Sequence, residues 1–556
     1  MISRRIVSRF AACSALGGGI LLSNDEGSRR SGYFWVNVFP IYLHYRSIQL
    51  VNRDLKIMSD ERADKIYDDL HNRYTDRVKA LTYELRGFYL KNAQLMSVQD
   101  DFVPKPYMKW CKDTQDNVPS EFTSSQAVRD YVSSKLLEDA GLKFDDVFSY
   151  WDDKPLGVAS IGQCHRAILR STGEVVAVKI LCPGMEKRFR SDIKTIKSFC
   201  SLAMPQHVSA LEEIERAFLT EFDYVREATY LNSVHKNIMP RYGSMVTIPK
   251  AHMNLCTKDI LVMEYLDGIK MVDGIKNNYS RLCALQGRTL EDMEKEMKEK
   301  LAKGEWKFKS IEEDKREKAR MKMYLTINDW IFSYNIPKLI HNISITRLIF
   351  GPCQYHFTEP PIDVGNLIEI LSAVHLSEIL DDGLFNGIIL FNTITSLLLI
   401  HIIGDAHPGN VLLLKNGKLG LIDYGQTKEL QLKDRVIIAK LILAMEREDK
   451  KEVVRLFLEE MGGRTKYTNE DIIYRLNVFY FDRNTNDICD GMNIATFLDY
   501  CESVDPMVQA PLKFVMAARV GIMLRGVGNA FGLKLSMAKI WKKQCQDFLK
   551  DHGIEY

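Results

Sequence analysis

Two short stretches late in the chain decide the fold: Gly404-Asp-Ala-His-Pro-Gly-Asn410 and Leu421-Ile-Asp-Tyr-Gly425. The apolar residues between them are interrupted by Asn416-Gly417, a dipeptide typical of a β-hairpin turn. A hairpin here would bring Asp423 back beside Asn410, so that an amide and a carboxylate come from the two ends of one rigid element. These side chains are suited to hold Mg²⁺ across the phosphates of a nucleotide. The pair therefore predicts a magnesium site.

The first stretch also contains a candidate catalytic residue. Phosphoryl transfer needs an Asp near the acceptor hydroxyl, and in the protein-kinase pattern this Asp precedes the metal-binding Asn by five residues. Asp405 precedes Asn410 by the same five residues. We therefore expect Asp405 to act as the base or to orient water, with Asn410 and Asp423 as Mg²⁺ ligands. His407 is followed by Pro and Gly, which favours a structural loop histidine over a base or a metal ligand.

Upstream, the hydrophobic periodicity predicts a small mixed lobe followed by a larger helical one. The expected elements are a hairpin of strands 161–169 and 174–181, helices 185–199 and 211–231, and a strand at 259–264 that runs into Tyr265-Leu-Asp-Gly268. Val176-Ala-Val-Lys179 matches the kinase strand whose Lys contacts the α- and β-phosphates. Taken alone, such a Lys is more often an edge residue with a solvated head. The order of the elements favours the phosphate contact.

Helical patterns dominate the rest of the chain. Residues 52–96 are expected to be helical with Gly87 as a weak point, and a second helix, 125–140, should end at Gly141. Residues 288–320 are heavily charged with both signs, and Glu and Lys recur four residues apart in the favourable order. We expect this stretch to be a solvated helical insertion.

Five separated motifs resemble those of the aarF-domain-containing (ADCK/UbiB) atypical kinase family, and most closely its plant branch and the nearest animal members. In place of a glycine-rich phosphate loop, the chain has Ala159-Ser-Ile-Gly-Gln163, preceded by Gly157 and Val158 where the family has Ala. The other motifs are Lys91-Asn-Ala-Gln94, Glu221-Phe-Asp223 with the later Glu227-Ala228, Asp405-Ala-His-Pro-Gly-Asn410 and Asp423-Tyr-Gly-Gln-Thr427. Ala93 and Ala406 replace residues that are Gly and Pro in the family pattern.

The resemblance implies an α+β, two-lobed protein-kinase-like fold with an N-terminal helical extension packed over the active site. It implies a nucleotide site for ATP and Mg²⁺ in which Lys179 contacts the phosphates and Glu221 pairs with that Lys, with Glu227 as the alternative partner. The other residues that it assigns to the nucleotide site are Lys91, Gln94, Ala159, Ser160 and the backbone around Glu264 and Leu266. Asp223 is expected beside the Lys91 face.

Five regions are expected along the chain. They are an organellar presequence or disordered tail (1–30), an N-terminal helical region (31–150), a kinase-like N-lobe (151–268), a C-lobe with the insertions 288–320 and 388–403 (269–430), and a C-terminal helical region (431–556).

The resemblance implies an ATP-dependent phosphotransferase or ATPase that acts in isoprenoid-quinone or membrane-lipid homeostasis rather than on peptides. The alternative is a catalytically silent scaffold that uses nucleotide to regulate a partner or a lipid. Expected partners are the nucleotide, lipid or quinone-pathway proteins, and a membrane surface touched peripherally. The formal net charge of +2 gives no reason to expect nucleic acid.

The cysteines and the N-terminus both bear on the location of the protein. Eleven cysteines without a Cys-x-x-Cys pair favour reduced thiols in an intracellular compartment. Before Asp25 there is no acidic residue, while Arg and Ser alternate, a composition typical of a mitochondrial presequence. Plastid and cytoplasmic locations are the alternatives.

Residues 388–403 are aliphatic and uncharged, and they separate two motifs that stand close together in the family. A translated intron is favoured for this stretch, against a hydrophobic loop for membrane contact or a buried strand. The stretch is too short and too broken by polar residues to be a confident membrane span.

Overall fold

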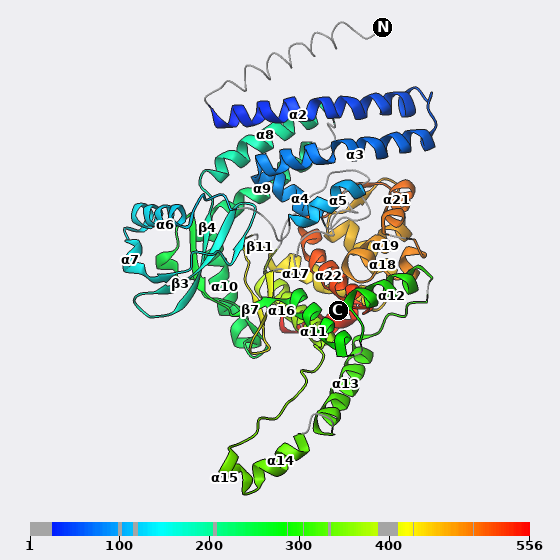
Figure 1. Ribbon diagram of the computed structural model, residues 1–556. Helices are drawn as coiled ribbons and strands as arrows, with labels where there is room; N and C mark the ends of the chain where they lie inside the picture. The colour runs from blue at the N-terminus through cyan, green and yellow to red at the C-terminus, as the bar shows by residue number, and fades with distance from the viewer. Residues whose placement is uncertain are drawn as a thin grey trace.

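The computed structural model describes residues 25–97, 103–114, 120–203, 208–285, 287–303, 305–331, 335–386, 410–425, 427–492 and 494–556. Its architecture is α+β: in the described part of the chain, one sheet in each lobe and two smaller strand pairs are surrounded by helices (Figure 1). The predicted presequence up to residue 24, the apolar insertion 388–403, Asp405 and His407 lie outside the described residues.

The N-lobe is built on a five-stranded antiparallel sheet. Its strands are β1 (Phe148–Trp151), β2 (Gly157–Val158), β3 (Gly162–Leu169), β4 (Val175–Leu181) and β6 (Ile260–Glu264). The order is β1-β3-β4-β6, with β2 paired to β3. β3 and β4 form the predicted hairpin, and Gly173 takes a left-handed φ of +72° in its turn. The predicted bounds of both hairpin strands agree with the structure to within one residue, because short apolar runs flank a turn sequence.

The N-terminal helical region lies along one side of this lobe. Its helices are α2 (Glu26–Gln49), α3 (Asp60–Leu85), α4 (Gly87–Met96), α5 (Lys105–Asp113), α6 (Ser125–Ala140) and α7 (Phe144–Val147), with a π-helical turn at Leu50–Asp54. α2 packs beside α3 and against α8 (Figure 1). α6 has the predicted bounds because Ser124 caps its first turn and Gly141 ends it with φ +68°. The predicted helical stretch 52–96 is divided at Arg86 and Gly87, which both have positive φ, so the break falls at the predicted weak point.

The boundary of the predicted N-terminal tail is wrong, because residues 26–30 belong to α2. Arg30 donates to both carboxylate oxygens of the buried Asp192 on α8, at 3.0 and 2.6 Å. This buried ion pair holds the start of α2 against the N-lobe. The alternation of Arg and Ser further upstream did not indicate such a contact.

The predicted helix 211–231 is also divided in the structure. The elements here are α8 (Met185–Ala203), α9 (Val208–Phe218), a 3₁₀ turn (Leu219–Phe222) and α10 (Tyr224–Tyr242). Asp223 is extended (φ −135°, ψ 92°), and its side chain accepts a hydrogen bond from the Arg226 amide. An Asp in this conformation is a strong N-cap, so a new helix starts here although the apolar periodicity continues.

The C-lobe contains a four-stranded sheet of order β5-β10-β9-β7. Its strands are β5 (Val246–Thr247), β7 (Gly268–Lys270), β9 (Val411–Leu414) and β10 (Leu419–Leu421). β9 and β10 pair antiparallel around Asn416-Gly417, where Gly417 has φ +80°, so the predicted hairpin is confirmed. Two further pairs join β8 (Leu384–Asn386) to β11 (Thr427–Glu429) and β12 (Arg464–Thr465) to β13 (Met507–Gln509).

Helices make up the remainder of the C-lobe and the C-terminal region. They are α11 (Met271–Leu285), α16 (Val364–Ser377), α17 (Leu432–Glu446), α18 (Lys450–Arg455), α19 (Glu470–Phe481), α20 (Asn486–Cys489), α21 (Ile494–Val504), α22 (Leu512–Ala530) and α23 (Met537–Asp551). Further turns are 3₁₀ at Met253–Leu255 and π-helical at Glu378–Asp382 and Leu456–Glu460. One continuous apolar core runs from α8 and α10 through α16 and α17 to α23.

The charged insertion is longer than predicted and consists of several helices. They are α12 (Leu290–Ala302), α13 (Ile311–Ile331), α14 (Asn335–Ile343) and α15 (Thr346–Phe350). Of the predicted Glu and Lys pairs, Glu296 and Lys300 form an ion pair at 2.6 Å. No helix in the described part of the chain is long and apolar enough to cross a bilayer.

Candidate active site

A cavity of about 350 Å³ lies where the N-terminal helices, the N-lobe sheet and the β9–β10 hairpin meet. α4, the loop from β2 to β3, β4, α10 and the hairpin all contribute side chains to it. Its lining includes the predicted site residues Lys91, Gln94, Ala159, Ser160, Lys179, Glu221, Asn410 and Asp423. Residues that are up to about 330 positions apart in the sequence therefore share one cavity.

Lys179 is held by Glu227, the alternative partner, so the preferred pairing with Glu221 is wrong. The ammonium of Lys179 donates to the two carboxylate oxygens of Glu227 at 2.7 and 3.0 Å. Glu221 lies in the 3₁₀ turn before Asp223, whereas Glu227 lies one turn into α10, where it is 3% exposed. The break at Asp223 places the two acids on different elements, and α10 directs the second one toward β4.

Helix α4 brings the predicted Lys91 face into the same cavity. The Lys91 ammonium lies 3.9 Å from a carboxylate oxygen of Glu221 and 5.6 Å from the centre of the Phe218 ring. Gln94 donates its side-chain amide to the Thr114 carbonyl at 2.9 Å. Glu221, rather than Asp223, is thus the acid that faces Lys91, because Asp223 is used as the cap of α10.

The two predicted magnesium ligands are adjacent. The Asn410 amide donates to one oxygen of Asp423 at 3.1 Å, and the Gly425 backbone amide donates to the other at 3.1 Å. The β9–β10 hairpin holds both residues, since Asn410 precedes β9 directly and Asp423 follows β10. The local prediction from the Asn-Gly turn therefore accounts for this part of the site.

The predictions for the loop at Ala159 and Ser160 and for the backbone around Glu264 and Leu266 have different outcomes. Ala159 donates its amide to the Gly162 carbonyl at 2.7 Å, and Ser160 is buried, so the loop folds tightly over β3. Glu264 and Leu266 are not among the cavity-lining residues, whereas Met263 is. Asp405 lies outside the described residues and its role stays a prediction.

The charges of the cavity influence one another strongly. Burial raises the pKa of Glu227 to about 7, although the Lys179 ammonium opposes this rise. Burial lowers the pKa of Lys179, but the carboxylates of Glu227 and Asp423 outweigh it and hold that pKa well above its usual range. Burial likewise raises the pKa of Asp423, and here Lys179, the Gly425 amide, Lys91 and Asn410 together bring it below its ordinary value. Asp423 is thus kept ionised.

Two residues of the site were missed from the sequence. Tyr224 is fully buried and its ring centre lies 5.1 Å from the Lys179 ammonium. Tyr424 is buried and donates its hydroxyl to the buried carboxylate of Glu378 at 2.9 Å, which fixes the residue after Asp423. Tyr424 stands in the Asp-Tyr-Gly stretch and Tyr224 in no motif, and only the tertiary structure shows the contacts of either side chain.

The residues present fit Mg²⁺ and a nucleotide. An ionised carboxylate and an amide oxygen are hard ligands of the kind Mg²⁺ takes beside phosphate oxygens. The Lys179 ammonium is fixed on the same cavity, as a phosphate contact requires. The volume lies within the range of small-molecule sites.

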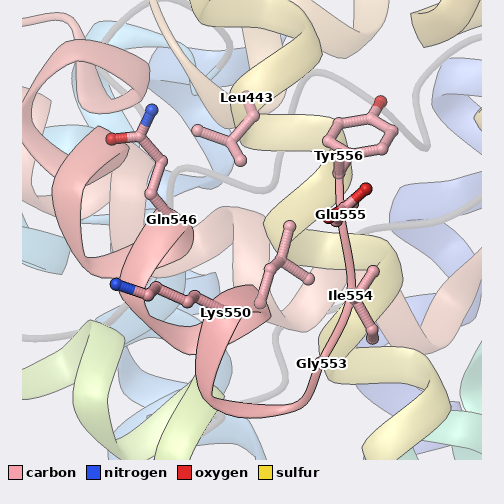
Figure 2. Close-up of a pocket in the computed structure, with 8 residues that line it drawn as sticks. Leu443, Gln546, Lys550, Gly553, Ile554, Glu555 and Tyr556 are labelled. Atoms are coloured by element: carbon pink, nitrogen blue, oxygen red, sulfur yellow. The ribbon is translucent and has the colours of Figure 1, made fainter.

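A second hollow, of about 530 Å³, lies between α17 and the C-terminal segment (Figure 2). It is lined by Leu443, Gln546, Leu549, Lys550, Gly553, Ile554, Glu555 and Tyr556. None of the predicted site residues lines it, and it holds no comparable group of facing charges, so the cavity around Lys179 is the candidate active site.

The chain is similar to known proteins over most of the stretches that line this cavity. The model of the ABC1 atypical kinase-like domain matches residues 114–300 and 366–457, just over half of the chain. The chain is 22% identical to an uncharacterized protein of Clostridium pasteurianum from the 5′ region of hydrogenase 1, over 82% of this chain and 68% of that protein. It is 25% identical to the AarF domain-containing protein kinase 1 of Gallus gallus, over 48% of this chain and 51% of that protein.

A plant protein is also similar to this chain. The chloroplastic protein Activity of BC1 complex kinase 1 of Arabidopsis thaliana is 29% identical, over 37% of this chain and 31% of that protein. The matched stretches hold Lys179, Glu227, Asn410 and Asp423, three charged residues and one amide that converge on the cavity. The chain therefore belongs to the ABC1 atypical kinase-like family, which includes proteins named AarF domain-containing protein kinases.

Proposed function

We propose that the chain binds Mg·ATP in the cavity around Lys179 and cleaves the bond to the γ-phosphoryl group, as a phosphotransferase or an ATPase. The observation that carries the proposal is the convergence of the Lys179–Glu227 pair and the Asn410–Asp423 pair on one cavity. Bringing these groups together desolvates them, which a purely structural arrangement would not require.

Each residue has a defined task in this proposal. Lys179 donates to the α- and β-phosphate oxygens, and Glu227 holds its ammonium in place. Asn410 and Asp423 hold Mg²⁺, which when bound neutralises charge that develops on the phosphate oxygens. Asp405 accepts the acceptor's proton or orients a water molecule. Lys91 and Gln94 face the nucleotide from α4.

The test is Mg²⁺-dependent ATP hydrolysis by the full chain and by Asp423→Asn, with and without lipid vesicles. Asp471→Asn, a change at an exposed ion-paired Asp on α19, is the matched control. We expect hydrolysis by the wild type and the control, and a loss of at least about 100-fold in Asp423→Asn, since one charge that acts in the transition state is removed.

Nucleotide binding measured on the same proteins separates the two functions considered for this chain. A wild type that binds ATP but hydrolyses no more of it than Asp423→Asn would show a nucleotide-dependent scaffold. A wild type that binds no nucleotide in the presence of Mg²⁺ would reject both functions.

We further propose a role in isoprenoid-quinone or membrane-lipid homeostasis in the mitochondrion. The motif resemblance supports the role, and the composition before Asp25 supports the location. The relatives also include a chloroplastic protein. Quinone and lipid content in cells that lack the protein should be restored by the wild type and not by Asp423→Asn. A fluorescent fusion of residues 1–30 should enter mitochondria.

A further inference from the structure

The chain from α13 to α16 forms an arm that projects away from the body, at the end opposite to α2 and α3 (Figure 1). α13 leads outward, α14 and α15 form the tip, and residues 351–363 return to α16. A helix of 21 residues such as α13 is roughly 30 Å long. The matched family stretches end at residue 300 and resume at 366, so the arm lies outside them.

The tip carries a concentration of exposed apolar side chains. On α14, Ile336, Leu339, Ile340 and Ile343 follow the spacing of one helix face, and all four are exposed. The next turn continues this surface. Its members and exposed fractions are Ile345 74%, Leu348 84%, Ile349 71% and Phe350 79%. In a water-soluble body a face of this kind packs on a core, whereas here it is turned outward.

Three pairs of polar groups bond within the arm. Asn342 donates to the Cys353 carbonyl and accepts from the Cys353 amide, both at 2.8 Å. Asn335 makes the same two-way contact with His356, at 2.5 and 2.9 Å. At the base, Asp329 accepts from the amide and the hydroxyl of Thr358 at 2.6 and 2.8 Å.

These three contacts tie the helices to the returning segment at regular intervals. Beyond its base the arm is therefore a preformed hairpin held by its own hydrogen bonds, whereas Glu359, Pro360 and Ile362 contact α11 of the body. Backbone groups bonded in this way lose little when the surface around them becomes apolar.

The outer part of the arm carries positive but no negative side chains, and aromatic residues cluster behind its tip. Between Asp329 and Glu359 the sequence has no acidic residue, while Lys338 and Arg347 carry positive charge. Behind the tip, Trp330 lies 5.8 Å from Tyr355 and 6.0 Å from Phe357, measured between ring centres. Aromatic side chains of this kind concentrate at the level of lipid headgroups.

We propose that the tip of the arm inserts into the headgroup region of an anionic lipid bilayer, with Lys338 and Arg347 against the phosphates and the Trp330 cluster at the interface. Helices of nine and five residues cannot span a bilayer, but they can lie in its surface. A second copy of the arm is a poorer partner, because the cations of two tips would face one another. This inference is independent of the proposed catalytic function.

Sedimentation of the full chain with vesicles tests the proposal. The vesicles are phosphatidylcholine with and without phosphatidylglycerol. The tip variant is Ile349→Asp with Phe350→Asp. The matched control is Ile57→Asp with Val508→Asp, two exposed apolar residues outside the arm, 75% and 67% exposed.

We expect the wild type and the control to bind anionic vesicles, and the tip variant to bind at least roughly tenfold more weakly, since two apolar side chains are lost from the inserted surface. Arg347→Glu should weaken binding to anionic vesicles and leave binding to neutral ones unchanged. Equal loss in the tip variant and the control, or no binding by the wild type, would overturn the proposal.

A spectroscopic signal locates the contact. Cys353 is exposed on the arm, so a polarity-sensitive thiol dye can be attached there, with Cys353→Ser as the blank for the other cysteines. The dye should report an apolar environment when anionic vesicles are added. A signal that changes instead with protein concentration, together with a tip variant that is monomeric where the wild type is dimeric, would show that the tip joins two copies and would reject the lipid surface.

Discussion

Glu227 is the residue on which the position of Lys179 depends. Its carboxylate is buried and accepts two hydrogen bonds from one ammonium group, so the direction of the Lys179 side chain is fixed from both oxygens. Charge-assisted bonds of this kind are stronger than neutral ones and have narrower geometry. A small change at Glu227 should therefore act on the nucleotide through Lys179.

Glu227→Gln keeps the shape of the side chain and removes its charge. We expect ATP turnover to fall by about 10- to 100-fold, because a charge-assisted hydrogen bond is worth about 1.5–3 kcal/mol. Steady-state hydrolysis of ATP measures the effect. Glu221→Gln is the control and should lower turnover less, since Glu221 faces Lys91 at 3.9 Å and not Lys179. If the two variants were to lose turnover equally, the pairing with Glu227 would have no special role.

At the scale of elements, the β3–β4 hairpin is packed so closely that one position admits no side chain. A Cβ atom on Gly162 would lie 2.4 Å from the Ile180 carbonyl oxygen and 2.9 Å from the Tyr224 hydroxyl. The first contact is with backbone of the paired strand, which cannot move without opening the sheet. The glycine in the Ala-Ser-Ile-Gly-Gln stretch thus has a steric cause.

Gly162→Ala should destabilise the N-lobe by about 1–3 kcal/mol, the usual range for an overpacked site. The thermal midpoint of unfolding measures this loss. Gly157→Ala is the control, because a Cβ there meets nothing within 4 Å and the backbone has no positive φ. A midpoint equal to that of wild type for Gly162→Ala would mean that β3 and β4 are less closely packed than the structure has them.

The contact of α2 with α8 should depend on pH. Burial raises the pKa of Asp192 to about 6, and Arg30 opposes but does not cancel this rise. The folded chain therefore keeps the proton to a higher pH than the unfolded chain, whose Asp has its ordinary pKa near 3.8. It follows that the contribution of Asp192 to the free energy of unfolding falls as the pH rises from about 4 to 6.

Asp192→Asn should remove this dependence. Between pH 7 and pH 5 we expect the wild type to gain about 1 kcal/mol relative to the variant, since one pH unit of differential protonation is worth about 1.4 kcal/mol. Unfolding midpoints of both proteins at matched pH give the difference. A difference that stays constant from pH 5 to pH 7 would show that Asp192 does not titrate in this range.

Predictions from the sequence succeeded where local chemistry decides the structure. The bounds of α6 follow from Ser124 and Gly141, and the hairpin that joins Asn410 to Asp423 follows from one Asn-Gly turn. They failed where apolar periodicity continues across a break, as at Asp223, because periodicity does not show which polar residue caps a helix. Because of that break, Lys179 pairs with Glu227 on α10 and not with Glu221. The cavity itself also depends on α4, whose direction is set by the positive φ of Arg86.

At the scale of the whole molecule, the arm and the body that holds the Lys179 cavity are separate structures. The hydrogen bonds between Asp329 and Thr358 close the arm at its base, and α13 and α16 pack together on the body side of this closure. The cavity around Lys179 takes no residue from the arm. Removal of the tip should therefore leave the lobes intact.

Replacing residues 332–356 by a short Gly-Ser linker should leave ATP hydrolysis and the thermal midpoint unchanged while it abolishes sedimentation with anionic vesicles. The retained Asp329 and Thr358 keep the base closed in this variant. Hydrolysis measured without lipid is the readout for the body. A fall in that activity would mean that the arm supports the two lobes from a distance.

The position of the β9–β10 hairpin late in the chain determines which of the two residue pairs can form first during synthesis. Asn410 and Asp423 are 13 residues apart and Lys179 and Glu227 are 48 apart, whereas the two pairs are separated by more than 180 residues. Hairpins close in about 1–10 μs, and short separations cost less chain entropy than long ones. The N-lobe sheet is complete by Glu264, before half of the chain has left the ribosome. During synthesis, Glu227 is thus available as the counter-charge of Lys179 long before Asn410 and Asp423 are made, and the nascent lobe does not have to bury that ammonium alone.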